Sequence, residues 1–327
     1  MTAARRWLAL AGVLLFIALI AWQGLPAILS TLSAAGAGLI LVALFHLLPM
    51  ALDAVAVWVF FDRGTRGGSL RDSLMMRWVG ESVNSLLPAG QLGGPVVMVR
   101  QLTQRGLPMP QAAAAITVST TFQMLGQMLF ALMGLALIGA RVRTPLLISV
   151  AVMAAILSSF YLTQRRGLFR SAIAPAIRFL NPARLPALIG QADAFDRAVQ
   201  ETYARRGRGT LSFALNLLGW LVGTGEVYLI LKMIQAPVSW QGALLLESLG
   251  QAIRGAAFAI PGALGVQEGG YLLLAPIAGL PSEAALALSL AKRARELLLG
   301  APGLLYLHFF ERRVSPVESS APRRTIL

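Results

Sequence analysis

The chain has 327 residues, of which 57% are hydrophobic and 13% are charged, and its mean hydropathy is +0.70. Long apolar stretches recur along it, so the composition excludes a soluble domain and is typical of a polytopic membrane protein. The sequence has no cysteine and only two histidines, which excludes thiol chemistry and leaves no visible metal cluster or cofactor site. The net charge of +14 comes from arginines between apolar stretches, which favours a topology-setting role over nucleic-acid binding.

Two apolar runs open the chain. One interpretation of residues 7–22 is a signal peptide, because two arginines precede the run. A retained span is favoured, because no convincing small-residue cleavage site follows and Trp7 and Trp22 stand where interfacial tryptophans occur. Residues 37–61 are expected to form the second span and to return to a basic loop.

The stretch from Glu81 to Pro95, closed by Arg100, interrupts the apolar pattern with an acid, two amides, two prolines and three glycines. Its prolines remove backbone donors and its glycines permit tight turns. The arms on either side are each roughly 15 Å of helix, half of a ~30 Å hydrocarbon core. This predicts a broken helix or re-entrant hairpin near residues 78–104, buried in protein or lining a wet cavity. The candidate site residues here are Arg77, Glu81, Asn84, Pro88, Gly90 and Arg100.

The rest of the chain alternates spans and connections. Further spans are predicted at residues 111–139, 145–162, 211–234 and 283–310. The polar stretch 164–209 carries nine arginines and three acids and predicts amphipathic helices on the cytoplasmic face. These helices either contact anionic lipid heads or anchor the positive side of the protein, and the second interpretation is favoured. A second interrupted element is predicted near residues 243–280.

Two parts of the chain match at an offset of 173 residues. Pro88 falls on Pro261, and Gly106-Leu107-Pro108 falls on Gly279-Leu280-Pro281. Proline and glycine interruptions at corresponding places in two halves are the best sequence indication of a transporter-like site. We therefore predict an inverted repeat, in which each half comprises two spans, a hairpin and a further span. The second hairpin adds Pro261, Gly265 and Glu268 to the candidate site.

The last apolar segment carries four charged residues, Lys292, Arg293, Arg295 and Glu296. Each charge at a helix centre costs about 2.5–3.5 kcal/mol on insertion scales, so the four are expected to face a polar interior. Helical spacing predicts a shared face for Lys292, Arg295 and Glu296, with Arg293 pointing elsewhere. One interpretation is an internal ion-pair cluster. The other is an anion site for a lipid head, because three bases face one acid unless acids at 247 or 268 balance them.

Other charged residues also lie within apolar or interrupted segments. Asp53 and Glu226 are single acids that serve either as proton-linked groups or as counter-ions, and counter-ions are favoured. The offset pairs Glu81 with Arg254, so an ion pair is expected across the pseudo-two-fold axis. We expect Arg254 and the bases of the last span to form one cationic surface, answered partly by Glu81 and partly by an anionic or polar lipid head. His46 is expected to be a satisfied core histidine.

Two motifs carry a resemblance to a known family. They read Arg77-Trp-Val-Gly-Glu81-Ser-Val-Asn84-Ser-Leu-Leu-Pro88-Ala-Gly90, followed by Gly93-Gly94, and Pro261-Gly-Ala-Leu-Gly265-Val-Gln-Glu268-Gly. They resemble the signatures of the lysylphosphatidylglycerol synthase transmembrane-region family, and residues 288–300 resemble its branch associated with hopanoid biosynthesis. The resemblance implies a bacterial inner-membrane protein with a flippase-like domain that moves or handles lipids. No lysyl-transferase domain is expected after the last span, and Pro95 stands where many relatives have an acid.

The predicted fold is an all-α polytopic membrane protein with about six full transmembrane helices and two re-entrant or broken hairpins. Residues 1–163 are predicted to form the first transmembrane half plus a connecting span, 164–209 a cytoplasmic basic connection, and 210–327 the second half with a short cytoplasmic tail. The predicted partners are membrane lipids, either hopanoid or anionic phospholipid, and lipid-biosynthesis proteins, with no nucleic acid.

The leading functional prediction is lipid transport between leaflets. The alternatives are an intramembrane lipid-modifying enzyme and a non-transporting assembly partner of lipid-biosynthesis enzymes. The sequence shows no nucleophile–base pair, metal set or phosphate loop, so we do not expect an enzyme.

Both termini and the connection 164–209 are predicted to face the cytoplasm, because 21 of the 28 basic residues then lie inside. Residues 24–36 and 235–240 are predicted to face outward. Single cysteines introduced into this cysteine-free chain report the side through labelling with a membrane-impermeant thiol reagent. We expect labelling at 24–36 and 235–240 in intact cells. Labelling of a cysteine near Gln191 from outside would contradict the inverted repeat.

Overall fold

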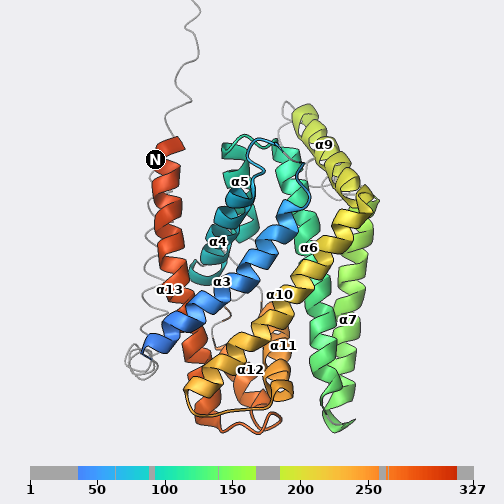
Figure 1. Cartoon of the computed structure of the whole chain (residues 1–327). Helices are drawn as coiled ribbons and strands as arrows, with labels where there is room; N and C mark the ends of the chain where they lie inside the picture. Colours follow the sequence, from blue (N-terminus) through green and yellow to red (C-terminus); the bar gives the residue numbers. More distant parts are fainter. Residues whose placement is uncertain are drawn as a thin grey trace, which may run out of the picture.

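The described residues of the computed structural model form ten α-helices and no strand (Figure 1). The structure describes residues 36–62, 64–87, 93–138, 140–166, 185–257, 263 and 265–314. The predicted first span and the turn residues Pro88, Gly90 and Pro261 lie outside this part of the chain. Within it, the predicted all-helical class is confirmed.

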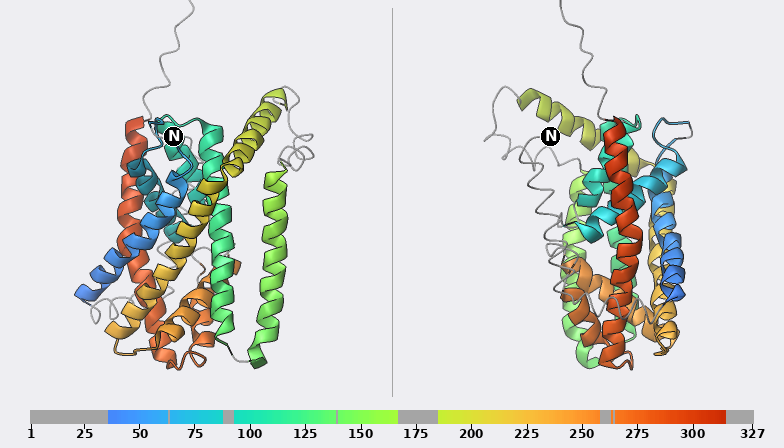
Figure 2. Two further views of the ribbon diagram at one scale, coloured as in Figure 1. Left: turned by 45° about the vertical axis from the view of Figure 1, so that its right-hand side comes forward. Right: turned by 90° about the vertical axis from the view of Figure 1, so that its left-hand side faces the viewer.

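Five long helices run between the two ends of the molecule (Figures 1 and 2). They are α3 (Ala37–Trp58), α6 (Met109–Ala136), α7 (Ala140–Arg165), α10 (Arg206–Met233) and α13 (Ser282–Val314). By length and composition, the described part of the chain offers three candidate membrane spans, at Gly38–Trp58, Met109–Ala136 and Arg206–Met233. The chain is therefore a membrane protein, and the total of six full spans stays a prediction.

The outward face of α3 agrees with a membrane setting. Leu41, Leu44 and Leu48 are each more than half exposed, and they recur at the three- and four-residue spacing of one helix face. Such a stripe would be an aggregation-prone patch in water, but it matches the hydrocarbon of a bilayer. The opposite side of α3 carries the polar residues described below.

Two pairs of shorter helices interrupt this pattern. Helices α4 (Leu70–Leu86) and α5 (Gly93–Gln104) pack against each other, and so do α11 (Trp240–Ala256) and α12 (Val266–Leu274). The first pair lies toward the end of the molecule that carries α9 (Leu185–Ala204), and the second pair lies at the opposite end (Figures 1 and 2). This is the placement expected of hairpins that enter from opposite sides. The inverted repeat itself stays a prediction.

The first hairpin is closed by small residues and one amide. Gly94 N–H donates to Asn84 Oδ1 at 2.7 Å, which joins the start of α5 to the last turn of α4. A Cβ at Gly94 would stand 2.5 Å from the Gly80 carbonyl oxygen, so glycine is required for the close approach. The candidate residue Asn84 thus accepts a hydrogen bond from the backbone where the second arm of the hairpin begins.

Helix α9 lies on the protein rather than apart from it. Val199 is fully buried, and Phe195 and Tyr203 pack against the hydrophobic cluster that includes residues of α6. The Tyr203 hydroxyl also donates to Gln164 of α7 at 2.9 Å. The apolar stripe predicted within residues 164–209 therefore contacts protein.

An ion pair ties the start of α10 to the loop after α3. Arg205 and Arg208 both contact Asp62, at 3.0 and 2.7 Å. Hydrogen bonds from Arg208 and then Arg205 hold the pKa of Asp62 below its ordinary value. These side chains are exposed, so the contact orients a connection and contributes little to stability.

Substitution of Gly94 by alanine is expected to open the first hairpin. The new Cβ meets backbone rather than a flexible side chain, and overpacking of this kind costs about 1–3 kcal/mol. Thermal unfolding in detergent should show a lower midpoint for Gly94→Ala. The matched control is Gly269→Ala, because a Cβ there meets nothing within 4 Å. Equal midpoints for the two variants would show that the α4–α5 contact is not tight.

Candidate functional site

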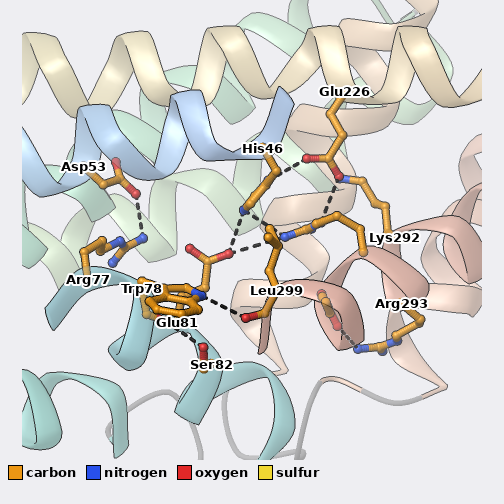
Figure 3. A network of polar contacts seen from close by, with 12 residues as sticks. His46, Asp53, Arg77, Trp78, Glu81, Ser82, Glu226, Lys292, Arg293 and Leu299 are labelled. Atoms are coloured by element: carbon orange, nitrogen blue, oxygen red, sulfur yellow. Dashed lines mark hydrogen bonds and ion pairs between the residues drawn. The ribbon is translucent and has the colours of Figure 1, made fainter. Parts of the chain in front are cut away.

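Charged side chains from six helices meet inside the molecule. Figure 3 shows the part of this set in which His46 lies between Glu81 and Glu226. We call this set the buried ionic network. On α13, Lys292, Arg293, Arg295 and Glu296 are each less than 7% exposed. The partners that face them are His46 on α3, Glu81 on α4, Glu226 on α10, Glu247 and Arg254 on α11, and Glu268 on α12.

His46 lies between two carboxylates. Its Nδ1 is 2.6 Å from Glu226 Oε2, and its Nε2 is 2.7 Å from Glu81 Oε1. The same Nε2 is 2.8 Å from Arg295 Nη1, which also lies 3.4 Å from Glu81 Oε1. One imidazole ring thus connects α3, α4, α10 and α13.

Lys292 extends this group toward α11. Its Nζ is 2.5 Å from Glu247 Oε2 and 3.9 Å from Glu226 Oε1. Gln251 donates to the other oxygen of Glu247 at 2.9 Å. Arg295 Nε approaches Glu226 Oε1 at 3.3 Å. We define the His46 cluster as His46, Glu81, Glu226, Glu247, Lys292 and Arg295.

The second part of the network lies beside the interruption between α11 and α12. Arg254 pairs with Glu296, and Arg293 Nη1 contacts the other oxygen of Glu296 at 3.0 Å. Arg293 Nε is 3.3 Å from Glu268 Oε1, which also accepts from Ser289 at 3.1 Å. We define the Arg293 cluster as Arg254, Arg293, Glu268 and Glu296.

Two polar atoms of the Arg293 cluster remain unsatisfied. Arg293 Nη2 and Glu268 Oε2 are buried and have no hydrogen-bond partner among the described residues. A buried charged group without a partner costs more than a neutral one, so such atoms call for a ligand or ordered water. The cluster therefore offers one donor and one acceptor to a polar group that reaches it.

Gly265 allows the backbone to turn at the start of α12. It precedes the first turn of α12 with φ 75°, a left-handed conformation that favours glycine. The candidate residue Gly265 thus sets the direction in which α12 leaves the interruption, and α12 in turn places Glu268 opposite Arg293.

Several predicted residues lie outside these clusters. Asp53 and Arg77 form their own pair at 2.6 Å, and Gln123 donates to the same Asp53 oxygen at 2.8 Å. Asp53 is thus a counter-ion, as favoured from the sequence, but its partner is Arg77 rather than a base of the last helix. Arg100 is exposed on α5.

The predicted pair between Glu81 and Arg254 is wrong. Glu81 contacts His46 and Arg295, whereas Arg254 contacts Glu296. The sequence offset places Glu81 and Arg254 at equivalent positions, but each has a nearer partner of opposite charge on another helix.

The predicted cationic surface is also wrong, because carboxylates from four other helices balance it. Glu247 and Glu268, the two acids that the sequence offered as possible partners, contact Lys292 and Arg293. Glu296 pairs with Arg293 three residues before it, rather than sharing a role with Lys292. These side chains therefore have the internal ion pairs that one interpretation of the last segment expected, and a lipid head beside them stays a prediction.

His46 is a satisfied histidine, as the sequence led us to expect, but its contacts with three other helices were not visible in the sequence. A single histidine within an apolar span matches no sequence motif. Such a histidine is usually a core residue whose ring nitrogens are hydrogen-bonded. One signal was available: His46 and Asp53 are seven residues apart, which places both on one face of a helix. That face is the polar side of α3.

These features define a helical membrane protein with a charged interior at two helix interruptions. The chain belongs to the lysylphosphatidylglycerol synthase transmembrane-region family, because the family model described as "Lysylphosphatidylglycerol synthase TM region" matches residues 7–303. The search of curated proteins and the search of solved structures each find no match. The family resemblance of the two motifs is thereby confirmed, and a lipid-related function in a membrane follows from it.

Lys292 and Glu247 are expected to show strong energetic coupling. Each side chain is at most 4% exposed, and removing one partner leaves the other charge buried, at a cost of about 3–5 kcal/mol. A double-mutant cycle with Lys292→Met and Glu247→Gln, measured by thermal stability in detergent, should give a double variant less destabilised than the two losses added.

The matched control is the exposed pair Arg205 and Asp62, whose side chains are 42% and 58% exposed. Coupling there should be at most about 1 kcal/mol. Additive losses for Lys292 and Glu247 would show that the buried contact does not contribute to stability.

Proposed function

We propose that this protein moves lipids between the leaflets of a bacterial inner membrane, with a hopanoid or an anionic phospholipid as cargo. The family match and the membrane helices support a lipid-related role. The pair of helix interruptions at opposite ends of the molecule supports transport, because transporters commonly bind their substrates at such discontinuous helices.

The observation that carries the proposal is the unsatisfied donor and acceptor of the Arg293 cluster. Arg293 Nη2 suits a phosphate or hydroxyl oxygen, and Glu268 Oε2 suits a hydroxyl or an amine. A lipid head carries such groups, and its acyl or polycyclic part can stay among apolar residues. The head would occupy the interior beside the interruption that follows α11.

Lipid-biosynthesis proteins would deliver or receive the cargo. Their participation is part of the proposal, as is the absence of catalysis by this chain itself. A modifying enzyme would return a lipid of changed mass. An assembly partner would leave the lipid in its original leaflet when it is the only protein present.

A leaflet-resolved assay tests these three functions. The protein is reconstituted alone into phosphatidylethanolamine and phosphatidylglycerol vesicles that carry fluorescent phosphatidylglycerol, with a second set carrying a hopanoid. Lipid movement is followed by chemical quenching of the outer leaflet, and lipid mass is followed by mass spectrometry. Movement without a mass change supports transport. A mass change, or no movement in either set, contradicts it.

Arg293→Gln is expected to slow lipid movement about tenfold or more, because a charge-assisted hydrogen bond contributes about 1.5–3 kcal/mol. Arg293→Lys keeps the charge and should recover part of the rate. The matched control is Arg197→Gln, which changes an exposed arginine on α9 and should leave the rate unchanged. Thermal unfolding separates a folding defect from lost binding. Full movement in a folded Arg293→Gln protein would remove this site from the lipid path.

A further inference from the structure

We propose that His46 binds and releases a proton, and that this proton exchange is coupled to the movement of lipid. The inference rests on the proposed function only for the lipid step. Proton binding itself rests on the geometry and charge of the His46 cluster, which is separate from the Arg293 cluster assigned to the lipid head.

The first observation is a conflict at one ring nitrogen. His46 Nε2 is 2.7 Å from Glu81 Oε1 and 2.8 Å from Arg295 Nη1. A carboxylate only accepts a hydrogen bond, and a guanidinium only donates one. Nε2 carries either a hydrogen or a lone pair, so it satisfies one of these neighbours at a time. The site therefore has two arrangements that differ by one proton.

The two arrangements connect different helices. With a proton on Nε2, the imidazolium donates to Glu81 and Glu226, and it links α3 to α4 and α10. Without it, Nδ1–H still donates to Glu226, while Nε2 accepts from Arg295 and links α3 to α13. Because Arg295 Nη1 lies 3.4 Å from Glu81 Oε1, Arg295 exchanges one acceptor for the other with little movement.

The second observation is the charge of the His46 cluster. Lys292 and Arg295 face the carboxylates of Glu81, Glu226 and Glu247, so three negative charges meet two positive ones. A proton on His46 supplies the missing positive charge. The Arg293 cluster is balanced without it, since two bases face two acids. An unbalanced charge is costly to bury, so a cluster with no net charge is favoured. The unbalanced negative charge lies at the cluster in which His46 can bind a proton.

Helices α4, α6, α10 and α13 pack on α3, and three of them bring charges to His46. Helix α4 contributes Glu81, α10 contributes Glu226, and α13 contributes Arg295, with Lys292 behind Glu226. Helix α6 carries no titratable side chain. On α3 itself, Asp53 is held by Arg77 of α4. The proton thus has two carboxylate neighbours and one guanidinium neighbour.

Glu81 is the most exposed of the three side chains that form the contact series Glu81, His46 and Glu226. Its side chain is 23% exposed, that of His46 is 15% exposed, and that of Glu226 is 2% exposed. Chains of Asp, Glu and His side chains that contact one another commonly relay protons within membranes. Glu81 also lies on α4 shortly before the first interruption, so the proton on His46 determines whether α4 is tied to α3 at this point.

The first experiment observes the proton directly. The chain has two histidines, and His308 is exposed on α13. In His308→Gln protein reconstituted into phosphatidylethanolamine and phosphatidylglycerol vesicles, ring-nitrogen NMR reports His46 alone. We expect the Nε2 signal to change between an imidazolium and a neutral ring as the pH is varied from about 4 to 10. A single protonation form throughout this range would overturn the proposal.

The second experiment measures coupling. Vesicles with fluorescent phosphatidylglycerol are given a pH difference of about one unit across the membrane. If each lipid moves together with one proton, this difference can change the ratio of labelled lipid between the two leaflets about tenfold. Valinomycin with equal potassium on both sides removes the membrane potential. We expect the ratio to depart from its value without a gradient, and His46→Gln to abolish the departure. The control variant His308→Gln should keep it.

The outcomes separate the two proposals. If wild-type protein moves lipid but ignores the gradient, the proton coupling is overturned and the proposed function stands. If it moves no lipid at all, the proposed function fails and the coupling fails with it, while the NMR titration still decides whether His46 binds a proton. If His46→Gln does not fold, the wild-type response to the gradient and the titration remain decisive.

Discussion

The structure depends on the rule that a charge inside a membrane protein must have a partner. Helix α13 carries four charged residues within five positions, and five other helices supply the groups that face them. Side-chain contacts within the bundle therefore do more than fill space. They specify which helices are neighbours, because an apolar surface alone packs almost equally well in several arrangements in lipid.

Small residues let these partners reach one another. A Cβ at Gly303 would stand 2.1 Å from Ser82 Oγ, and one at Gly300 would stand 2.6 Å from Leu86 Cδ1, so α13 and α4 approach closely. Trp78 Nε1 donates to the Leu299 carbonyl at 2.8 Å across the same contact. This approach brings Glu81 within reach of Arg295. Glycine spacing and ion pairing are thus two parts of one interface.

The sequence predicted the helical class, the long helices and the charged interior of the last segment, because these follow from hydropathy and spacing along one helix. It did not predict the partners. The pairing of Glu81 with His46 rather than Arg254 depends on how α3 and α4 lie against each other, and no local pattern contains that information. The role of Glu247 was similar: its charge was visible, but its distance to Lys292 was not.

The carboxylates that face Lys292, Arg293 and Arg295 belong, apart from Glu296, to helices that come earlier in the chain. During synthesis, α4, α10, α11 and α12 therefore emerge from the ribosome before the bases of α13 do. Helix α13 is poorly suited to enter lipid alone, but its counter-ions are already in the membrane when it arrives. The order of the segments makes biogenesis directional, and the last helix completes a bundle that earlier helices have prepared.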